Sequence, residues 1–365
     1  MGAMKADQTG LEQFALGKEI VGRINELAAI SETREHLTRI FLTPEHRLAA
    51  DLIVTWMREA GMSAHLDAIG NVCGRYEGDR PSLPCLMLGS HYDTVRDAGK
   101  WDGPLGVITA LACVADLNRR GKRLPFAIEV VGFADEEGVR FASTLLGSRA
   151  VAGTFDENVL DGRDRDGISM RDALKKFGLD PDHIRAAARA RRELLAYLEL
   201  HIEQGPVLEA NGLPVGVVTA IAGATRMAAK LTGMAGHAGT VPMALRRDAL
   251  VGAAECINAI EEFCRNDENG PVGTVGYIQA MPGATNVIPG QVSFTIDIRA
   301  PSGITIQNVI IEWGDGQTQS LGGASGTITV THPYPAGVRT YPVIVTVIDS
   351  TGTRTSGSTI VSITT

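Results

Sequence analysis

Long apolar runs are missing from this chain of 365 residues, since none approaches the roughly 18–20 residues that a membrane-spanning helix needs. Residues 1–10 lack the apolar core of a secretion signal. A basic excess is missing too: the formal net charge is −8 at pH 7, whereas nucleic-acid-binding proteins usually carry a basic face. We therefore expect neither a membrane nor a nucleic acid as partner.

Cysteine pairs at metal-binding spacing are also absent, because the cysteines form no CxxC motif. An odd number of cysteines in largely apolar surroundings is typical of reduced thiols in a cytoplasmic protein. We expect structural core residues and predict a cytoplasmic location. The five cysteines are Cys73, Cys85, Cys113, Cys256 and Cys264.

The chain is long enough for two or three domains, and its 44% hydrophobic content suits buried cores. Residues 84–137 alternate between strand-like, loop and helical patterns, which predicts an α/β domain with a largely parallel or mixed sheet. Ahead of them, residues 11–60 have helical spacing, with Thr43 as a helix cap and Pro44 in the first turn. Residues 161–192 are charged, and we predict surface helices there.

The character of the sequence changes twice more. After residue 213, the pattern strand, helix, strand, strand predicts a smaller two-layer α+β domain over 214–301. Over 302–365 charged residues thin out, and short alternating runs between turn residues predict a small all-β sandwich. We expect residues 1–213 to form one α/β domain.

Histidines and carboxylic acids cluster directly after strand-like runs, or close to them in the chain. In open α/β sheets, ligands bind just outside the carboxyl ends of the strands. Residues of metal-ligand type placed there repeatedly predict a two-metal hydrolytic site. The four segments are Ser90-His91-Tyr92-Asp93, Trp101-Asp102-Gly103, Ala134-Asp135-Glu136-Glu137-Gly138 and Glu199-Leu200-His201-Ile202-Glu203-Gln204-Gly205.

A metal needs several ligands that converge from different elements. His91 offers an imidazole nitrogen, and Asp93 can bond the other nitrogen and so orient the ring. Asp102 can bridge two cations with its two oxygens. Two cations about 3.5–4 Å apart would activate a water and polarise a carbonyl.

Glu136 and Glu137 are adjacent, so that one can ligate a cation while the other accepts a proton from a water. His201 supplies a further nitrogen. Taken singly, each candidate has a structural explanation: a hydrogen-bonded histidine, an Asp-Gly turn or a solvated helix start. Their ordered appearance at successive strand ends favours the metal site.

Three further candidates lie in the smaller domain. His237 could donate a hydrogen bond to a developing oxyanion, and Arg299 has the planar fork that suits a substrate carboxylate. Asn286 lies in a loop rich in turn residues. A turn histidine, an Asx-turn and a surface ion pair are the structural alternatives for the three.

Residues 23–301 resemble the dinuclear metal-dependent amidohydrolases that include N-carbamoyl-L-amino-acid hydrolase, allantoate amidohydrolase and β-ureidopropionase, which are relatives of aminoacylases and carboxypeptidases. The resemblance implies a metallo-aminopeptidase-like catalytic domain with a lid and dimerisation domain. The stretch around His201 points to the carbamoylase and allantoate branch. The matching stretches are GSHYDTVRDAGKWDGPLGV, FADEEGVRF, GSRAVAG, LELHIEQGPVLE, GMAGHAGTVPMALRRDAL and GATNVIPGQVSFTIDIR.

The resemblance also implies roles for the candidates. His91, His201 and Glu137 would be metal ligands, Asp102 the bridging carboxylate and Glu136 the general base. The implied substrate contacts are Gln204, His237, Asn286 and Arg299. The family implies a homodimer in which His237 reaches the neighbouring subunit's site, and two cations of zinc, manganese, cobalt or nickel.

The family pattern stops near residue 301, before the segment that normally supplies the last metal-ligand histidine. Residues from about 303 resemble a polycystic-kidney-disease-type (PKD) β-sandwich, as in a chimera. His332 is the only later histidine, and we reject it as a ligand because its Thr-His-Pro-Tyr turn suits packing within a sandwich. We expect a weakened second metal site, and an exposed sheet edge with apolar surface.

The sequence therefore predicts a hydrolase that cleaves the C–N bond of an N-carbamoyl or ureido compound bearing a carboxylate. The alternative from another class is a catalytically impaired binding or adhesion protein that acts through the PKD-like domain. A peptidase of the same family is a third possibility, which the surroundings of His201 disfavour.

Overall fold

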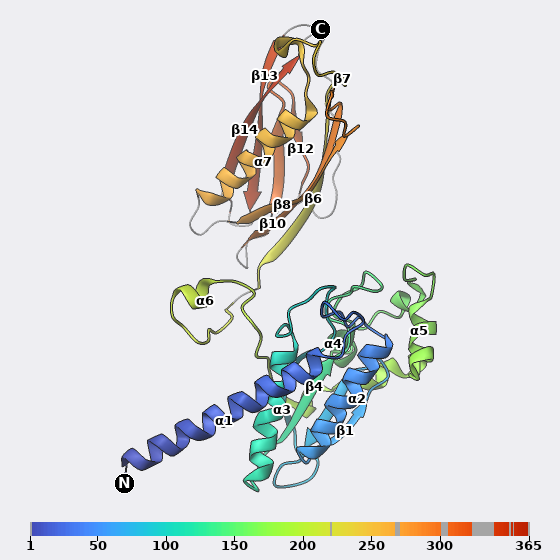
Figure 1. Cartoon of the computed structure of the whole chain (residues 1–365), viewed down its shortest axis with the longest axis vertical. Coiled ribbons are helices and arrows are strands. Elements are labelled where there is room, and N and C mark those ends of the chain that lie inside the picture. Colours follow the sequence, from blue (N-terminus) through green and yellow to red (C-terminus); the bar gives the residue numbers. More distant parts are fainter. Residues whose placement is uncertain are drawn as a thin grey trace. The chain divides into compact units, whose positions relative to one another are not determined.

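A computed structural model describes residues 2–219, 221–266, 271–300, 306–322, 339–349, 352 and 354–363. The chain divides into two compact units, Met1–Pro214 and Val215–Thr365, and Figure 1 shows the elements of each. No helix within the described ranges is long and apolar enough to cross a membrane.

The first unit is built on a five-stranded sheet with the strand order β1-β2-β4-β3-β5. Strands β4, β3 and β5 run parallel, while β1 and β2 are antiparallel additions. The predicted mixed sheet is thus confirmed. The strands are β1 (Ser63–Leu66), β2 (Val72–Tyr76), β3 (Cys85–His91), β4 (Ala127–Phe133) and β5 (Leu194–Leu198).

Helices cover this sheet and enclose the main core. Helix α1 (Gly2–Ala28) packs on α3 (Pro104–Arg119), α2 (Pro44–Glu59) packs on β1 and β2, and α3 packs on β3 and β4. Apolar side chains of all three helices join those of β2 and β4 in one buried cluster. The predicted start of α2 is confirmed, because the Thr43 side chain accepts a hydrogen bond from the His46 N–H and Pro44 follows the cap.

The charged segment 161–192 differs from its prediction. It contains one short α-helix, α5 (Met170–Phe177), with 3-10 turns on either side, and not a run of surface helices. Met170, Leu174 and Ile184 are buried in the main core. The many charged residues concealed the apolar pattern of these few buried side chains, which pack an otherwise irregular segment against the core. The remaining short helices of the unit are α4 (Leu146–Val151) and α6 (Val207–Ala210).

His46, in the first turn of α2, is fully buried. Burial lowers the pKa of His46 to about 3, and the charge of Arg39 acts in the same direction. The ring therefore stays neutral in the folded protein below the ordinary histidine pKa of 6.5, while the unfolded chain takes up a proton. As the pH falls below 6.5, this proton uptake stabilises the unfolded state relative to the folded one.

We expect His46 to lower the free energy of unfolding by about 1.4 kcal/mol per pH unit as the pH falls from 6.5 toward 4.5. Urea unfolding of the wild type and of His46→Gln, followed by tryptophan fluorescence at several pH values, measures this term. In the variant, the free energy of unfolding should fall less steeply with decreasing pH, because the contribution of His46 is lost. The contribution of the carboxylates is common to both proteins and should remain. Equal slopes would contradict the assignment.

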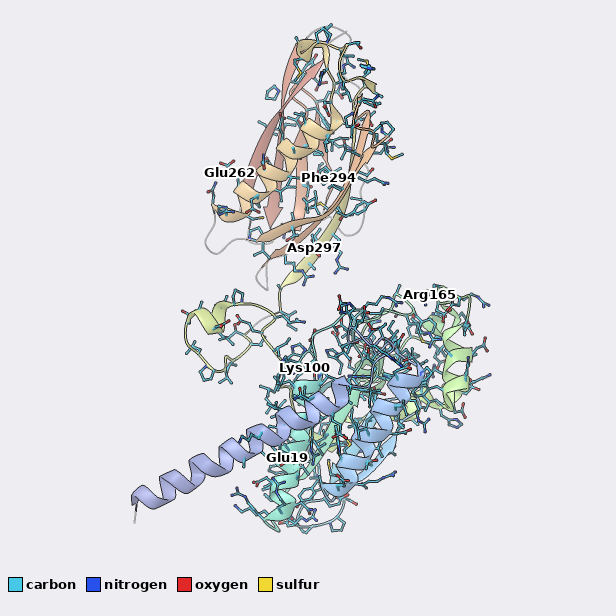
Figure 2. The ribbon with its side chains drawn as sticks, viewed as in Figure 1. Glu19, Lys100, Arg165, Glu262, Phe294 and Asp297 are labelled. Atoms are coloured by element: carbon cyan, nitrogen blue, oxygen red, sulfur yellow. The ribbon has the colours of Figure 1, made fainter. Side chains whose placement is uncertain are left out.

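The second unit contains a three-stranded antiparallel sheet, in the order β6-β10-β8, with a helix packed on it. Helix α7 (Ala249–Arg265) is capped by Asp248, whose carboxylate accepts hydrogen bonds from two N–H groups of the first turn. Phe294 of β10 is buried under α7 (Figure 2). The predicted order of elements is present. The strands are β6 (Gly223–Thr232), β8 (Val272–Met281) and β10 (Gln291–Ala300), and a small pair consists of β7 (Gly236–His237) and β9 (Val287–Ile288).

The C-terminal strands form a four-stranded antiparallel sheet in the order β12-β11-β13-β14. Its buried side chains include Val309, Ile311, Tyr341 and Val343, and β14 contacts α7. All-β character after residue 302 agrees with the prediction, but the described strands make one sheet and not the two layers of a sandwich. The strands are β11 (Ile306–Glu312), β12 (Thr318–Ser320), β13 (Arg339–Asp349) and β14 (Arg354–Ile363).

Candidate metal centre

His91 is the last residue of β3 and lies opposite Phe133, the last residue of the parallel strand β4. Its ring is almost completely buried. Nδ1 lies 3.0 Å from the backbone oxygen of Asp93, which can only accept, so Nδ1 carries the proton. The lone pair of Nε2 therefore points away from the backbone and is available to a cation.

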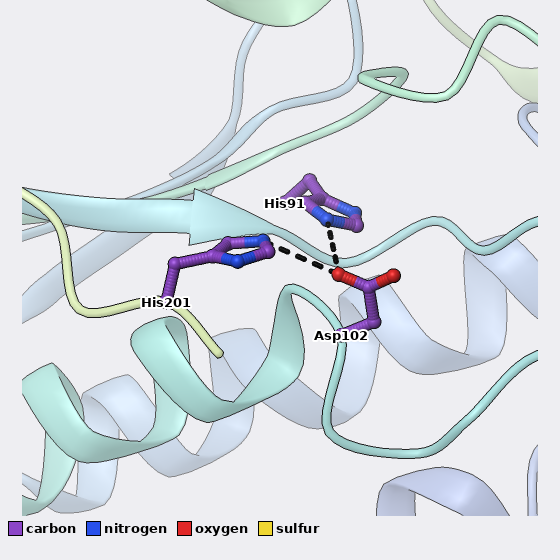
Figure 3. A group of neighbouring side chains, drawn as sticks. All are labelled: His91, Asp102 and His201. Atoms are coloured by element: carbon purple, nitrogen blue, oxygen red, sulfur yellow. Dashed lines mark ion pairs between the residues drawn. The ribbon is translucent and has the colours of Figure 1, made fainter. Parts of the chain in front are cut away.

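His201 repeats this arrangement in the loop that follows β5. Its Nδ1 lies 2.9 Å from the backbone oxygen of Ile202, which again places the proton on Nδ1. Its Nε2 lies 3.2 Å from Oδ1 of Asp102, and Nε2 of His91 lies 3.7 Å from the same oxygen. Figure 3 shows the two rings directed at the Asp102 carboxylate.

The three side chains fit a divalent cation. Ligand atoms of His91, Asp102 and His201 all lie within 4.8 Å of one another. Within the described part of the chain, the buried Oδ1 of Asp102 has no hydrogen-bond partner. Two nitrogen lone pairs and a carboxylate oxygen facing one point require a positive charge between them, and imidazole and carboxylate suit zinc or manganese.

The neighbouring carboxylates change the pKa values of this group. Burial opposes a charge on His91, but its contacts with Asp102 and Asp93 outweigh burial and raise the pKa of His91 to about 11. The same contact with His91 lowers the pKa of Asp102. A proton then takes the place of the cation, and cation binding releases it.

Gly103 makes room for this geometry. Its φ is +79°, in the left-handed region, and a Cβ at this position would lie 2.6 Å from the ring of His91. The glycine thus lets the start of α3 approach the ligand ring. The sequence alone indicated only a turn at Gly103, because its contact with the His91 ring joins two separate segments of the chain.

A second group consists of His91, Glu136 and Glu137, whose ligand atoms also lie within 4.8 Å of one another. Burial raises the pKa of Glu136, and burial together with the Glu136 charge raises the pKa of Glu137. Among the described residues, no such group contains both Asp102 and Glu137. The two groups therefore share His91. Asp102 belongs to the first group alone, and not to both as a bridging carboxylate would.

Asp93 connects the two strand ends. Its carboxylate lies 3.5 Å from Nδ1 of His91, farther than its own backbone oxygen. The two carboxylate oxygens accept hydrogen bonds from the N–H groups of Glu136 and Glu137, at 3.1 and 3.2 Å. Asp93 thus holds the loop after β4 as well as facing the histidine.

Gln204, expected to contact substrate, donates a hydrogen bond of 2.8 Å from its amide nitrogen to Oδ2 of Asp102. This bond occupies the second carboxylate oxygen, the one that a bridging role would present to another cation. Gln204 therefore orients the Asp102 carboxylate in this structure.

The candidates of the second unit divide into two places. His237 is exposed on β7 and pairs with Val287, next to Asn286. Arg299 lies near the far end of β10, roughly 25 Å along that strand from Gln291, and bonds Asp297 at 3.1 Å. The structure brings His237 and Asn286 together but not Arg299. His332 lies outside the described residues.

Sequence reasoning missed the groups that support the ligands. Arg39 is fully buried and donates hydrogen bonds to the backbone oxygens of Tyr92, at 2.9 Å, and of Leu27, at 3.0 Å. It thereby fixes the loop between His91 and Asp93. No local pattern marks an arginine that pairs with a segment more than fifty residues away.

Comparisons with known proteins show the family of this chain. A family model described as Peptidase family M20/M25/M40 matches residues 87–361. The chain is 46% identical over 280 residues to the N-carbamoyl-L-amino-acid amidohydrolase of Pseudomonas sp. (strain NS671), covering 76% of this chain and 68% of that protein. It is 43% identical over 321 residues to the allantoate deiminase of Arabidopsis thaliana, covering 82% and 61%.

A solved structure has the same fold over most of the chain. The crystal structure of a hydantoinase/carbamoylase family amidase from Burkholderia ambifaria superposes with a TM-score of 0.70 at 35% identity, covering 78% of this chain and 69% of that one. The chain thus spans between 61% and 69% of the length of these three relatives.

Proposed function

Because this chain belongs to peptidase family M20/M25/M40, we propose that it hydrolyses the C–N bond of an N-carbamoyl amino acid or of a ureido acid resembling allantoate. The observation that carries the proposal is the convergence of His91, Asp102 and His201 on one point beside the acid pair Glu136 and Glu137. The names of the relatives from Pseudomonas and Arabidopsis support this substrate class over peptides.

The proposed mechanism assigns each residue a task. His91, Asp102 and His201 hold a divalent cation of zinc, manganese, cobalt or nickel, and Glu137 serves a second one. Bound there, a cation polarises the substrate carbonyl and lowers the pKa of a water. Glu136 takes the proton of the attacking water and gives it to the leaving amine, and the raised pKa of its carboxyl suits this exchange.

Substrate contacts complete the proposal. Arg299 and Asn286 bind the substrate carboxylate, Gln204 contacts the substrate beside Asp102, and His237 stabilises the oxyanion. Because Arg299 lies apart from the pair His237 and Asn286, we propose that the protein is a homodimer in which His237 and Asn286 both serve the site of the neighbouring subunit.

We further propose the domain roles. Residues 1–213 form the catalytic domain, 214–301 a partial lid and dimerisation domain, and 302–365 a PKD-type sandwich, of which the described strands form one sheet. The second cation is held weakly, because among the described residues its group adds only His91 to the acid pair Glu136 and Glu137. Two tightly held cations per chain in a metal analysis would contradict this point. The five free thiols support a cytoplasmic location.

The purified protein, supplied with manganese, should release ammonia or free amino acid from N-carbamoyl amino acids or allantoate, and should leave dipeptides intact. Cleavage of dipeptides alone would favour a peptidase. No turnover of any of these compounds with zinc, manganese, cobalt or nickel would favour the alternative, a binding protein that acts through its C-terminal domain.

A further inference from the structure

The loop that carries Glu136 and Glu137 begins at Ala134, immediately after β4. The backbone N–H and the carbonyl oxygen of Ala134 are both hydrogen-bonded to side chains, and not to a neighbouring strand. Its N–H donates to Oδ1 of Asn71 at 3.0 Å, and its carbonyl oxygen lies 3.0 Å from Nε2 of His46. Both of these side chains are completely buried.

The neighbours of His46 determine its tautomer. The N–H of Leu42 lies 3.3 Å from Nδ1 and can only donate, so Nδ1 accepts. The proton is then on Nε2, and this nitrogen donates to the carbonyl of Ala134. The backbone of His46 is fixed in turn, because its N–H donates to the Thr43 side chain at the start of α2.

The same ring contacts the other strand end. It stacks on Tyr92 with 4.3 Å between centroids and 10° between planes, and Tyr92 separates His91 from Asp93. The Tyr92 hydroxyl donates a 2.7 Å hydrogen bond to the oxygen of Gly70. One imidazole therefore touches the segment of the ligand histidine and the segment of the acid pair.

Asn71 supplies the second hold. Its amide nitrogen donates to Oδ2 of Asp67 at 2.8 Å and to the oxygen of Gly147 at 3.1 Å, so its orientation is fixed. A Cβ on Gly147 would lie 2.3 Å from Oδ1 of Asn71. Glycine at 147 is thus needed for Asn71 to reach Ala134.

We propose that His46 and Asn71 are positioning residues, which fix Ala134 and thereby set the carboxylates of Glu136 and Glu137 against His91. The consequence for turnover rests on the proposed function, but the geometric role does not. The side-chain hydrogen bonds of His46 and Asn71 join backbone groups and the Asp67 carboxylate, and not a candidate ligand side chain. They act through the backbone, in the way that outer hydrogen bonds orient the ligands of metal sites.

Amide hydrogen exchange of the metal-free protein tests the role without any activity. The N–H groups of Glu136 and Glu137 donate to Asp93, which follows β3, and the N–H of Gly138 donates to Asp135 within the loop. In His46→Leu these amides should exchange about tenfold faster, because one fixing hydrogen bond is lost, while the amides of β4 keep their rates. His46→Gln retains a donor and should restore most of the protection.

Tyr76→Phe is the matched control. It removes a 2.9 Å hydrogen bond from a buried hydroxyl to the oxygen of Lys122, near the opposite end of the strands, and should leave the loop unchanged. Gly147→Ala displaces Asn71 and should accelerate amide exchange in the loop as His46→Leu does. This second variant tests the proposal if His46→Leu fails to fold.

Wild-type exchange rates in the loop of either variant would overturn the proposal, as would equal acceleration throughout the first unit. With a hydrolysed substrate, His46→Leu should lower kcat about tenfold with KM within a factor of about two, because the reacting groups are displaced and not the substrate contacts. Absence of wild-type turnover would contradict the proposed function alone and leave the exchange result standing.

Discussion

Glu136→Gln is expected to lower kcat by a factor of about 10²–10⁴, with little change in KM. Glutamine has nearly the size of glutamate, but its amide cannot take a proton from water and pass it to the leaving amine. The carboxyl is half-buried beside His91, and its raised pKa reflects that burial. Initial rates with an N-carbamoyl amino acid and added manganese measure the effect.

The matched control is Glu59→Gln, at the exposed end of α2, which makes the same chemical change away from the site. It should keep the wild-type kcat. If Glu136→Gln retained more than about a tenth of the wild-type kcat, the proton would be carried by another group, and Glu137 would be the first to examine.

Asp102→Asn should weaken cation binding by roughly a hundredfold or more. The carboxylate oxygen between the two Nε2 atoms is the negative member of the group. An amide oxygen binds a cation more weakly, and an amide nitrogen turned toward the rings would repel it. Titration of the metal-free protein with zinc, in competition with a fluorescent chelator, measures the change.

Asp97→Asn is a suitable control, because Asp97 also pairs with a histidine in a neighbouring loop. Its carboxylate lies 2.8 Å from Nδ1 of His36, at an exposed position outside both ligand groups. Zinc affinity should remain at the wild-type value in this variant. Equal affinity in Asp102→Asn and the wild type would rule out the first ligand group as the tight site.

Much of the first unit could be predicted from the sequence, because its signals are local. Thr43 and Pro44 mark the start of α2 through the backbone needs of a helix terminus. His91 meets the acid pair for a similar reason: the neighbouring parallel strands β3 and β4 end at one edge of the sheet, so the last residue of β3 lies beside the loop after β4.

The supporting residues could not be predicted, because their roles depend on partners far away in the chain. His46 and Asn71 reach Ala134 across 88 and 63 positions. Position 103 requires glycine because a Cβ there would collide with the ring of His91, a contact that only the structure shows. In the second unit, we expected His237 and Arg299 to belong to one group. In the structure, Arg299 lies at the end of β10 that is far from β7.

Strand β5 ends the sheet, and its side chains are exposed on both faces. Leu195 is 57% and Leu198 is 62% exposed, although the strand is as apolar as its buried neighbours. Covering a leucine side chain is worth about 1.5–3 kcal/mol. Any molecule that covers this strand only in the folded state adds its binding free energy to that of unfolding. The free energy of unfolding of the first unit therefore depends on whatever covers β5, as well as on the chain itself.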